Sequence, residues 1–323
     1  MRKVWAIAGG STLVYIVLAL MMAIIPGIEL SKTPPGPGVK PLTALQSEGR
    51  AVYAANGCGY CHTQQVRPLA EDKPFGRPSA PGDFTYQTPE LLGSERTGPD
   101  LTDVGVQQGS DVWQYMHLYN PRSVVPQSIM PSFSWLFRVV PKAPADVAAV
   151  PVPAAFAPAH GVVIPTPQAQ ALVAYLLSLR QAPIAGAAAA GSGAGTPASA
   201  PPQGAAMANT SSPSSAAGAS LFSANCASCH QASGEGLPGA FPPLKANAAV
   251  NDSDPTLHIH TVLFGAHGLT VGGVAYASAM PPFGTQLNDQ QVADLIDYER
   301  SAWGNHGRPV STHEVAAVRA LGH

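Results

Sequence analysis

The sequence has 323 residues, of which 46% are hydrophobic and only 11% are charged, and its formal net charge is -2. This length leaves room for roughly two or three small domains. The weak charge gives neither the basic surface of a nucleic-acid-binding protein nor an acidic tail, so we expect no nucleic-acid partner.

The amino-terminal stretch is predicted to anchor the chain in a membrane. Arg2 and Lys3 precede an uncharged apolar run from Val4 to Ile25. At ~1.5 Å per residue this run makes a helix of about 33 Å, enough to cross a hydrocarbon core of about 30 Å. The run is longer than the apolar part of a signal peptide, which is the alternative, so we expect an uncleaved single-pass anchor within residues 1–30. The positive-inside rule then predicts a cytoplasmic amino terminus in a bacterial inner membrane and a periplasmic remainder.

After a Pro/Gly-rich spacer, Thr43 is predicted to begin a helix that runs to Ala55 and leads into a Cys-x-x-Cys-His pattern. This pattern attaches a chain covalently to haem, because the two thiols form thioethers with the vinyl groups and the histidine ligates the iron. It occurs twice and uses all four cysteines, which leaves a zinc site as the weaker alternative. We therefore predict two covalently bound haem c groups, the first on Cys58 and Cys61 with His62 as an iron ligand, and the second on Cys226 and Cys229 with His230 as an iron ligand.

The helices around these patterns resemble those of class I cytochromes c. Gly49 and Tyr53 lie one helical turn apart before the first pattern, and a similar Gly/aromatic pair precedes the second. Apolar residues at helical spacing predict a final helix over residues 168–179 and another over 289–302, the latter capped by Asn288. In class I cytochromes c the Gly/aromatic pair lets the first helix cross the last one closely. The resemblance implies a mainly α fold with two such domains.

Each iron is expected to have a methionine as its other axial ligand, because a thioether stabilises the ferrous form. Met130 and Met280 each follow a haem pattern and precede a proline, whereas the other five methionines lie in or near the membrane segment, on a helix-like run or in a linker. With both ligands present neither iron has an open position, so we expect electron transfer and no catalytic residue. A haem peroxidase, which needs one open iron, is a weaker alternative. The resemblance also implies that the carbonyl groups of Pro99 and Pro242 accept the Nδ1 protons of the two ligating histidines.

Four blocks in the first half carry a narrower resemblance: Gly57–Pro68, Gly93–Leu101, His117–Pro126 and Met130-Pro131. Together with the anchor they resemble the membrane-anchored mono-haem cytochrome subunit of the cbb-type, C-family haem-copper cytochrome oxidases, over roughly residues 42–180. The resemblance implies that the chain passes electrons to the haem-copper catalytic subunit. The blocks contain Arg67, Arg96 and Arg122, for which both structural roles and contacts with haem propionates or a partner stay open. His117 is expected to be a hydrogen-bonded structural residue.

The rest of the chain is divided by composition. Residues 181–215 carry no charge and consist mostly of Ala, Gly, Pro and Ser, which predicts a flexible linker. Residues 216–305 are the predicted second cytochrome c domain, and residues 306–323 a tail whose short helix opens with a capping box at Ser311. The Pro/Ala-rich run Val139–Pro167 is interpreted as a loop. Six further histidines are expected to be solvated: His258, His260, His267, His306, His313 and His323.

We therefore predict a dihaem electron-transfer subunit of a cbb-type terminal oxidase. Electrons would run from a donor to the second haem, then to the first haem, then to the catalytic subunit. Its expected partners are the catalytic and other oxidase subunits, membrane lipid, and a donor such as a soluble cytochrome c or a quinol-oxidising complex. A subunit of a periplasmic dehydrogenase, or of a complex like nitric oxide reductase, is the alternative.

Overall fold

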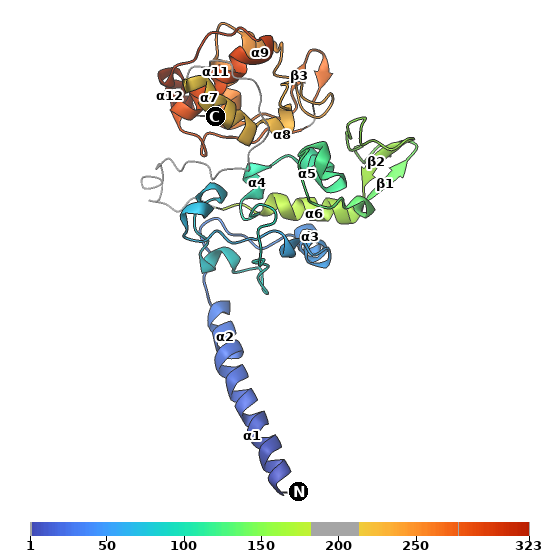
Figure 1. Cartoon of the computed structure of the whole chain (residues 1–323), viewed down its shortest axis with the longest axis vertical. Coiled ribbons are helices and arrows are strands. Elements are labelled where there is room, and N and C mark those ends of the chain that lie inside the picture. The colour runs from blue at the N-terminus through green and yellow to red at the C-terminus, as the bar shows by residue number, and fades with distance from the viewer. Residues whose placement is uncertain (1, 182–212, 277, 323) are drawn as a thin grey trace.

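The computed structural model describes residues 2–181, 213–276 and 278–322. A helical stalk, a first domain and a second domain follow one another, and the second domain lies on the side of the first that faces away from the stalk (Figure 1). The regular structure in these residues is mainly helical. Most of the predicted linker, residues 181–215, lies outside the described residues.

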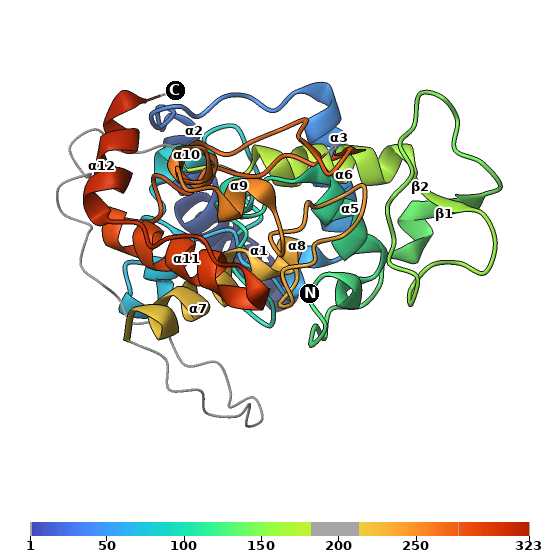
Figure 2. The same ribbon diagram turned by 90° about the horizontal axis from the view of Figure 1, so that it is seen from above.

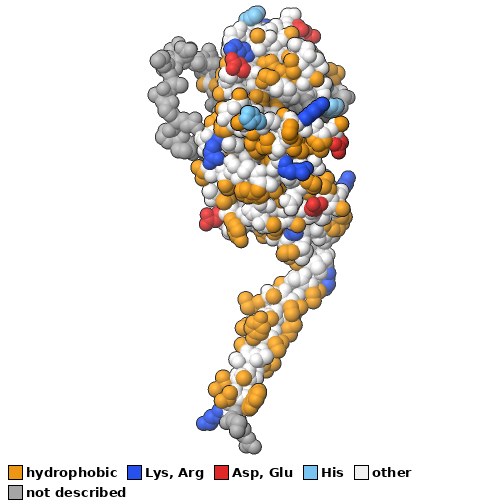
Figure 3. Space-filling view, turned by 90° about the vertical axis from the view of Figure 1, so that its right-hand side faces the viewer, with side chains coloured by type: hydrophobic (Ala, Val, Ile, Leu, Met, Phe, Trp, Pro, Cys, Tyr) orange, Lys and Arg blue, Asp and Glu red, His pale blue; other side chains and the backbone are white. Residues whose placement is uncertain are grey.

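The stalk consists of α1 (Arg2–Ala19), a π-helical turn (Leu20–Ile24) and α2 (Ile25–Ser31). Its span Lys3–Ser31 is long and apolar enough to cross a membrane, and none of it is buried against the rest of the protein. Apolar side chains cover the stalk along its length (Figure 3). The helix thus continues beyond the uncharged run that ends at Ile25, for about another turn and a half, to Ser31.

The helices of the first domain are α3 (Ala44–Ala55), α4 (Val104–Gln107), α5 (Asp111–Tyr119) and α6 (Pro167–Ser178). Short 3₁₀ turns connect them at Cys58–Tyr60, Ala70–Phe75, Pro81–Phe84, Pro121–Ser123 and Ser134–Leu136. Helix α3 begins where the sequence predicts, because Thr43 and Gln46 form a capping box in which Thr43 Oγ1 accepts from Gln46 N at 3.2 Å.

The crossing of α3 and α6 builds the core of this domain. A Cβ atom on Gly49 would lie only 1.9 Å from the carbonyl oxygen of Ala171, so the two backbones touch. One turn later Tyr53 packs edge-on against Tyr175, with ring centroids 5.7 Å apart. The predicted close crossing of the first and last helices is confirmed.

The second domain repeats this arrangement with α7 (Pro213–Asn225) and α11 (Asp289–Ser301). A Cβ atom on Gly218 would lie 2.1 Å from the carbonyl oxygen of Asp294. Asn288 caps α11, as predicted, through a bond from Gln291 N of 2.9 Å. The other elements are α8 (Ala227–His230), α9 (Ala248–Asn251), α10 (Thr256–Phe264), β3 (Thr270–Val271), β4 (Val274–Ala275), the 3₁₀ turn Ala302–Gly304, and α12 (Thr312–Leu321), which the predicted box at Ser311 opens.

The prediction of a loop over Val139–Pro167 is wrong at both ends of the run. Strand β1 (Phe137–Val140) pairs antiparallel with β2 (Val162–Pro165), with Arg138 opposite Ile164. The hairpin projects from the side of the first domain (Figure 2). The Pro/Ala composition of the whole run hid a short Val/Ile segment, which has the β-branched side chains that favour a strand.

The two domains contact each other close to their haem patterns. Leu237, Ala240 and Phe241 of the second domain pack with the apolar core of the first, and Phe241 is only 3% exposed. In the other direction, Gln107 and Gln108 at the end of α4 line a cavity of the second domain. The described parts of the two domains therefore share an interface.

Two candidate haem sites

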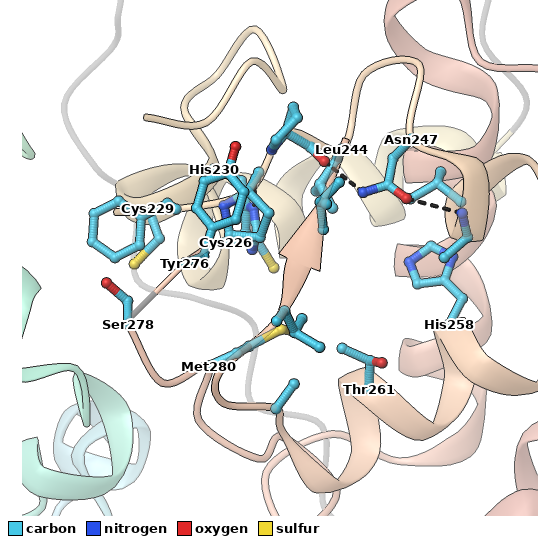
Figure 4. A pocket seen from close by; sticks show the side chains of 18 of the residues that line it. Cys226, Cys229, His230, Leu244, Asn247, His258, Thr261, Tyr276, Ser278 and Met280 are labelled. Atoms are coloured by element: carbon cyan, nitrogen blue, oxygen red, sulfur yellow. Dashed lines mark hydrogen bonds between the residues drawn. The ribbon is translucent and has the colours of Figure 1, made fainter. Parts of the chain in front are cut away.

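The second Cys-x-x-Cys-His pattern lines a cavity of about 670 Å³ (Figure 4). Helix α8 carries Cys229 and His230 on one turn directly after Cys226, so all three side chains reach the same cavity. The Nδ1 atom of His230 lies 2.8 Å from the carbonyl oxygen of Pro242 and donates its proton to it. Burial lowers the pKa of His230, so the ring is neutral and its Nε2 lone pair is available to a metal.

Met280 lies on another side of the same cavity (Figure 4). Its backbone is fixed by two hydrogen bonds with Ala266, one donated by Met280 N over 2.7 Å and one accepted by Met280 O over 3.1 Å. Gly265 has φ +78°, and a Cβ atom there would lie 2.5 Å from Met280 O, so a glycine is needed beside this residue. A thioether is thus held at a defined place opposite an imidazole.

The donor set of this cavity fits a covalently attached haem. The volume lies within the range of about 300–1,000 Å³ that ligand sites have. Burial raises the pKa of Cys229 to about 12 and that of Cys226 well above its usual range. Thioether sulfur atoms carry no charge and therefore suit this apolar setting. Among the residues that the structure describes, no three His, Cys, Asp or Glu side chains form a cluster suited to a metal ion.

The first pattern has matching geometry around its histidine. His62 Nδ1 lies 2.8 Å from the carbonyl oxygen of Pro99. The backbone of Gly98 lies against the ring, since a Cβ atom there would be 2.2 Å from His62 Cε1. Burial lowers the pKa of His62 and raises that of the Cys58 thiol to about 11. The same reasoning as for the second site therefore applies, and these residues also fit a haem.

Met130 is partly buried beside the core of the first domain, which Cys58 also contacts. Its amide donates to Ser128 Oγ over 3.2 Å, and Arg122 Nη1 donates to its carbonyl oxygen over 3.3 Å. Arg122 therefore supports the loop that carries this methionine.

The other two arginines of the sequence blocks belong to one buried network. The Asp72 side chain is fully buried, and it forms ion pairs with both Arg67 and Arg96. Arg96 also reaches Asp100, at 3.4 Å, and that carboxylate accepts a 2.5 Å hydrogen bond from Thr63. The network ties the segment after the haem pattern to the Pro99 segment, which is a structural role.

Two histidines differ from their predicted roles. His117 stacks on Trp113 with ring centroids 4.5 Å apart, and its Nδ1 atom has no hydrogen-bond partner among the described residues. Burial lowers its pKa to about 4. His258, predicted to be solvated, is only 5% exposed, and its Nε2 atom lies 2.8 Å from Glu299 Oε2. A helical projection of α10 would have placed His258 with Val262 on the buried face, which is the signal that the sequence reasoning missed.

In each domain two helices cross at a glycine, and the first of the two leads into a Cys-x-x-Cys-His turn. This arrangement defines the protein as a c-type cytochrome with two domains. Residues 3–163 match the family described as cytochrome c oxidase, mono-heme subunit/FixO, and residues 215–303 match the cytochrome c family. The chain therefore contains a domain of the cytochrome c oxidase mono-heme subunit/FixO family, followed by a cytochrome c domain. Two cytochrome c regions imply covalent haem c.

Individual relatives include subunits of two dehydrogenases and a cytochrome c-552. The chain is 37% identical over 107 residues to the cytochrome c subunit of a quinone alcohol dehydrogenase from Gluconobacter oxydans, covering 33% of this chain and 22% of that protein. It is 39% identical over 104 residues to the cytochrome c subunit of gluconate 2-dehydrogenase from Pantoea cypripedii, covering 32% of this chain and 24% of that protein. It is 35% identical over 112 residues to cytochrome c-552 of Thermus thermophilus, covering 32% of this chain and 84% of that protein. The chain thus spans less than a quarter of the length of these two dehydrogenase subunits.

Proposed function

We propose that this chain is the dihaem electron-transfer subunit of a cbb-type terminal oxidase, in which the second haem passes electrons to the first. The observation that carries this proposal is the interface between the domains. Pro99, whose carbonyl holds His62, and Gln107, which lines the second cavity, lie on one short segment of the first domain. Phe241, which enters the core of the first domain, directly precedes Pro242. Each histidine-supporting segment therefore adjoins the other domain.

Both haems are proposed to be low-spin and six-coordinate. The first would be attached through Cys58 and Cys61, and the second through Cys226 and Cys229. When bound, each haem supplies one-electron redox chemistry to the protein. The chain's own residues hold the two groups with the ligand pairs His62 with Met130 and His230 with Met280, and the carbonyl groups of Pro99 and Pro242 keep the two imidazoles in one tautomer.

The position of the domains supports the order of transfer. The first domain adjoins the stalk, and the second lies on its far side (Figure 1). With the stalk in the bacterial inner membrane and both domains in the periplasm, the second domain is the one that a soluble cytochrome c or a quinol-oxidising complex reaches more easily. The first domain is the one nearer to a haem-copper catalytic subunit embedded in the membrane.

Isolation in mild detergent tests this function. A tag on the carboxyl terminus would retain the second domain, and subunits that co-purify would be identified by mass spectrometry. The expected result is a multi-span haem-copper subunit in the same complex, with two low-spin c-type haems on this chain. Isolation without any haem-copper subunit would refute the proposal.

A second candidate is an electron-accepting subunit of a periplasmic dehydrogenase. It is favoured by the identity to subunits of an alcohol dehydrogenase and a gluconate dehydrogenase, which extends over about a third of this chain. The same isolation separates the two candidates, because this one requires a dehydrogenase subunit in place of the haem-copper subunit.

A further inference from the structure

One wall of the second haem cavity comes from the other domain. The cavity of about 670 Å³ is lined by the second Cys-x-x-Cys-His pattern, but also by Gln107 and Gln108 of the first domain. Beside them, a Cβ atom on Gly109 would lie 3.7 Å from Cβ of Pro281, the residue that directly follows Met280. A short segment of the first domain thus lies against the methionine side of the second site.

The segment that forms this wall is fixed within the first domain. The amide of Gln108 donates to the carbonyl oxygen of Val104 over 2.8 Å, and Gln114 Nε2 donates to that of Gln108 over 2.9 Å. The side chain of Gln107 donates through Nε2 to the carbonyl oxygen of Phe75 over 3.2 Å. These bonds all lie within the first domain, so the wall is held in place independently of the second domain.

The opposing surface of the second domain is also well defined. Leu237 and Phe241 exchange two backbone hydrogen bonds of 2.8 Å, which close the turn that contains Ala240. The next residue, Pro242, has its carbonyl oxygen 2.8 Å from His230 Nδ1, so the turn is tied to the haem-binding histidine. The side chains of Leu237, Ala240 and Phe241 pack with the apolar core of the first domain, and Ala240 is completely buried.

The two haem-attaching segments meet in this contact. Cys229 of the second pattern and Cys58 of the first pack against the same apolar core. Phe241 belongs to that core and also lines the second cavity. Surfaces that are ordered before they associate lose little conformational freedom on contact, which favours one fixed arrangement. The contact therefore adds a constraint that a flexible linker over residues 181–215 would not impose.

We propose that the second haem site is built by both domains, with Gln108 as one of its residues, and that the second domain is a fixed relay beside the first and not a mobile carrier. A fixed relay keeps one distance between the two haems, whereas a domain held only by a flexible linker samples many distances. This inference rests on the two haems of the proposed function, but it does not depend on which complex the chain joins.

Nuclear magnetic resonance of the oxidised full-length chain in detergent tests the role of Gln108. The methyl groups of a low-spin ferric haem give hyperfine-shifted resonances, whose positions respond to the side chains next to the haem. Gln108→Ala is expected to shift the resonances of the second haem and to leave those of the first unchanged, although Gln108 belongs to the first domain. The control Gln168→Ala, at an exposed position of α6, is expected to shift neither set. The second haem is identified by the resonances that are lost in the Cys226→Ala, Cys229→Ala double variant.

Distances between two nitroxide labels test the fixed arrangement. The labels are attached to the full-length protein through Ala51→Cys on α3 and Ser220→Cys on α7, both at exposed positions. Double electron–electron resonance is expected to give one narrow distance distribution. Ala240→Asp places a carboxylate in the apolar contact and is expected to broaden the distribution, because a buried charge without a partner is costly. Ala224→Asp, at an exposed position of α7, is the control and is expected to leave the distribution narrow.

Three results would overturn the proposal. They are a broad distribution in the labelled chain that carries neither aspartate, a distribution that stays narrow with Ala240→Asp, and a shift of the second haem's resonances by Gln108→Ala that is no larger than the shift by Gln168→Ala or than that of the first haem. Failure of the proposed function is a separate result, since both measurements use this chain without any partner subunit.

Discussion

The closest approach in the first domain makes a quantitative prediction for Gly49→Ala. In an exposed helix this change stabilises by about 1 kcal/mol, because alanine is the better helix former. Here the new Cβ atom would lie 1.9 Å from the Ala171 carbonyl oxygen and 2.8 Å from Tyr175 Cβ. A backbone carbonyl cannot rotate away, so the helices must separate, at the upper end of the overpacking cost of about 1–3 kcal/mol. The net expectation is a loss of about 2 kcal/mol.

Thermal unfolding of the full-length protein, followed by circular dichroism, measures this loss. For a domain of this size about 2 kcal/mol lowers the Tm by roughly 6–10 °C. Gly59→Ala is the control, because its Cβ atom would have its nearest contact at 3.9 Å from Tyr53, and it is expected to change little. Gly218→Ala should lower the transition of the second domain instead, since its Cβ atom would meet the Asp294 carbonyl at 2.1 Å. Equal Tm values for Gly49→Ala and Gly59→Ala would refute the reasoning.

Three further changes test the ligand set and the charge networks. Met280→Ala is expected to make one ferric haem high-spin and to lower its potential, and an unchanged low-spin electron paramagnetic resonance spectrum would contradict that ligation. Arg96→Leu leaves the buried Asp72 carboxylate short of one cation and should cost about 3 kcal/mol in urea unfolding; a cost below about 1 kcal/mol would show that the pair matters little. The hydrogen bond from Arg308 is the main cause that lowers the pKa of Glu314 from 4.5 to about 2. The stabilisation of the folded protein by this carboxylate is therefore complete above pH 4.5 and is lost as the pH falls towards 2. Because about a third of Glu314 is exposed, the loss in acid titrations of stability should be about 1 kcal/mol, and Glu314→Gln should abolish it.

The features that the sequence predicts well are local in the chain. A Cys-x-x-Cys-His pattern has a fixed spacing set by its chemistry, and caps such as those at Thr43 and Asn288 involve side chains three residues apart. The helix crossings followed from a glycine and an aromatic residue one turn apart. These features need no knowledge of what lies across the fold.

The features that the sequence did not predict depend on distant partners. His258 and Glu299 are 41 residues apart, and neither side chain alone indicates that the other is its hydrogen-bond partner. Arg67 and Arg96 left several roles open until Asp72 was seen between them. The packing of Phe241 into the core of the first domain could not be predicted either, because an apolar residue in the sequence does not indicate which of two cores it joins.

Time-resolved oxidation of the fully reduced complex by oxygen tests the central proposal most directly. Electrons that leave through the catalytic subunit must be drawn first from the haem next to it. The first haem, with Met130 as its proposed ligand, is expected to be oxidised before the second, with Met280 as its proposed ligand. Oxidation of the second haem before the first would contradict the account.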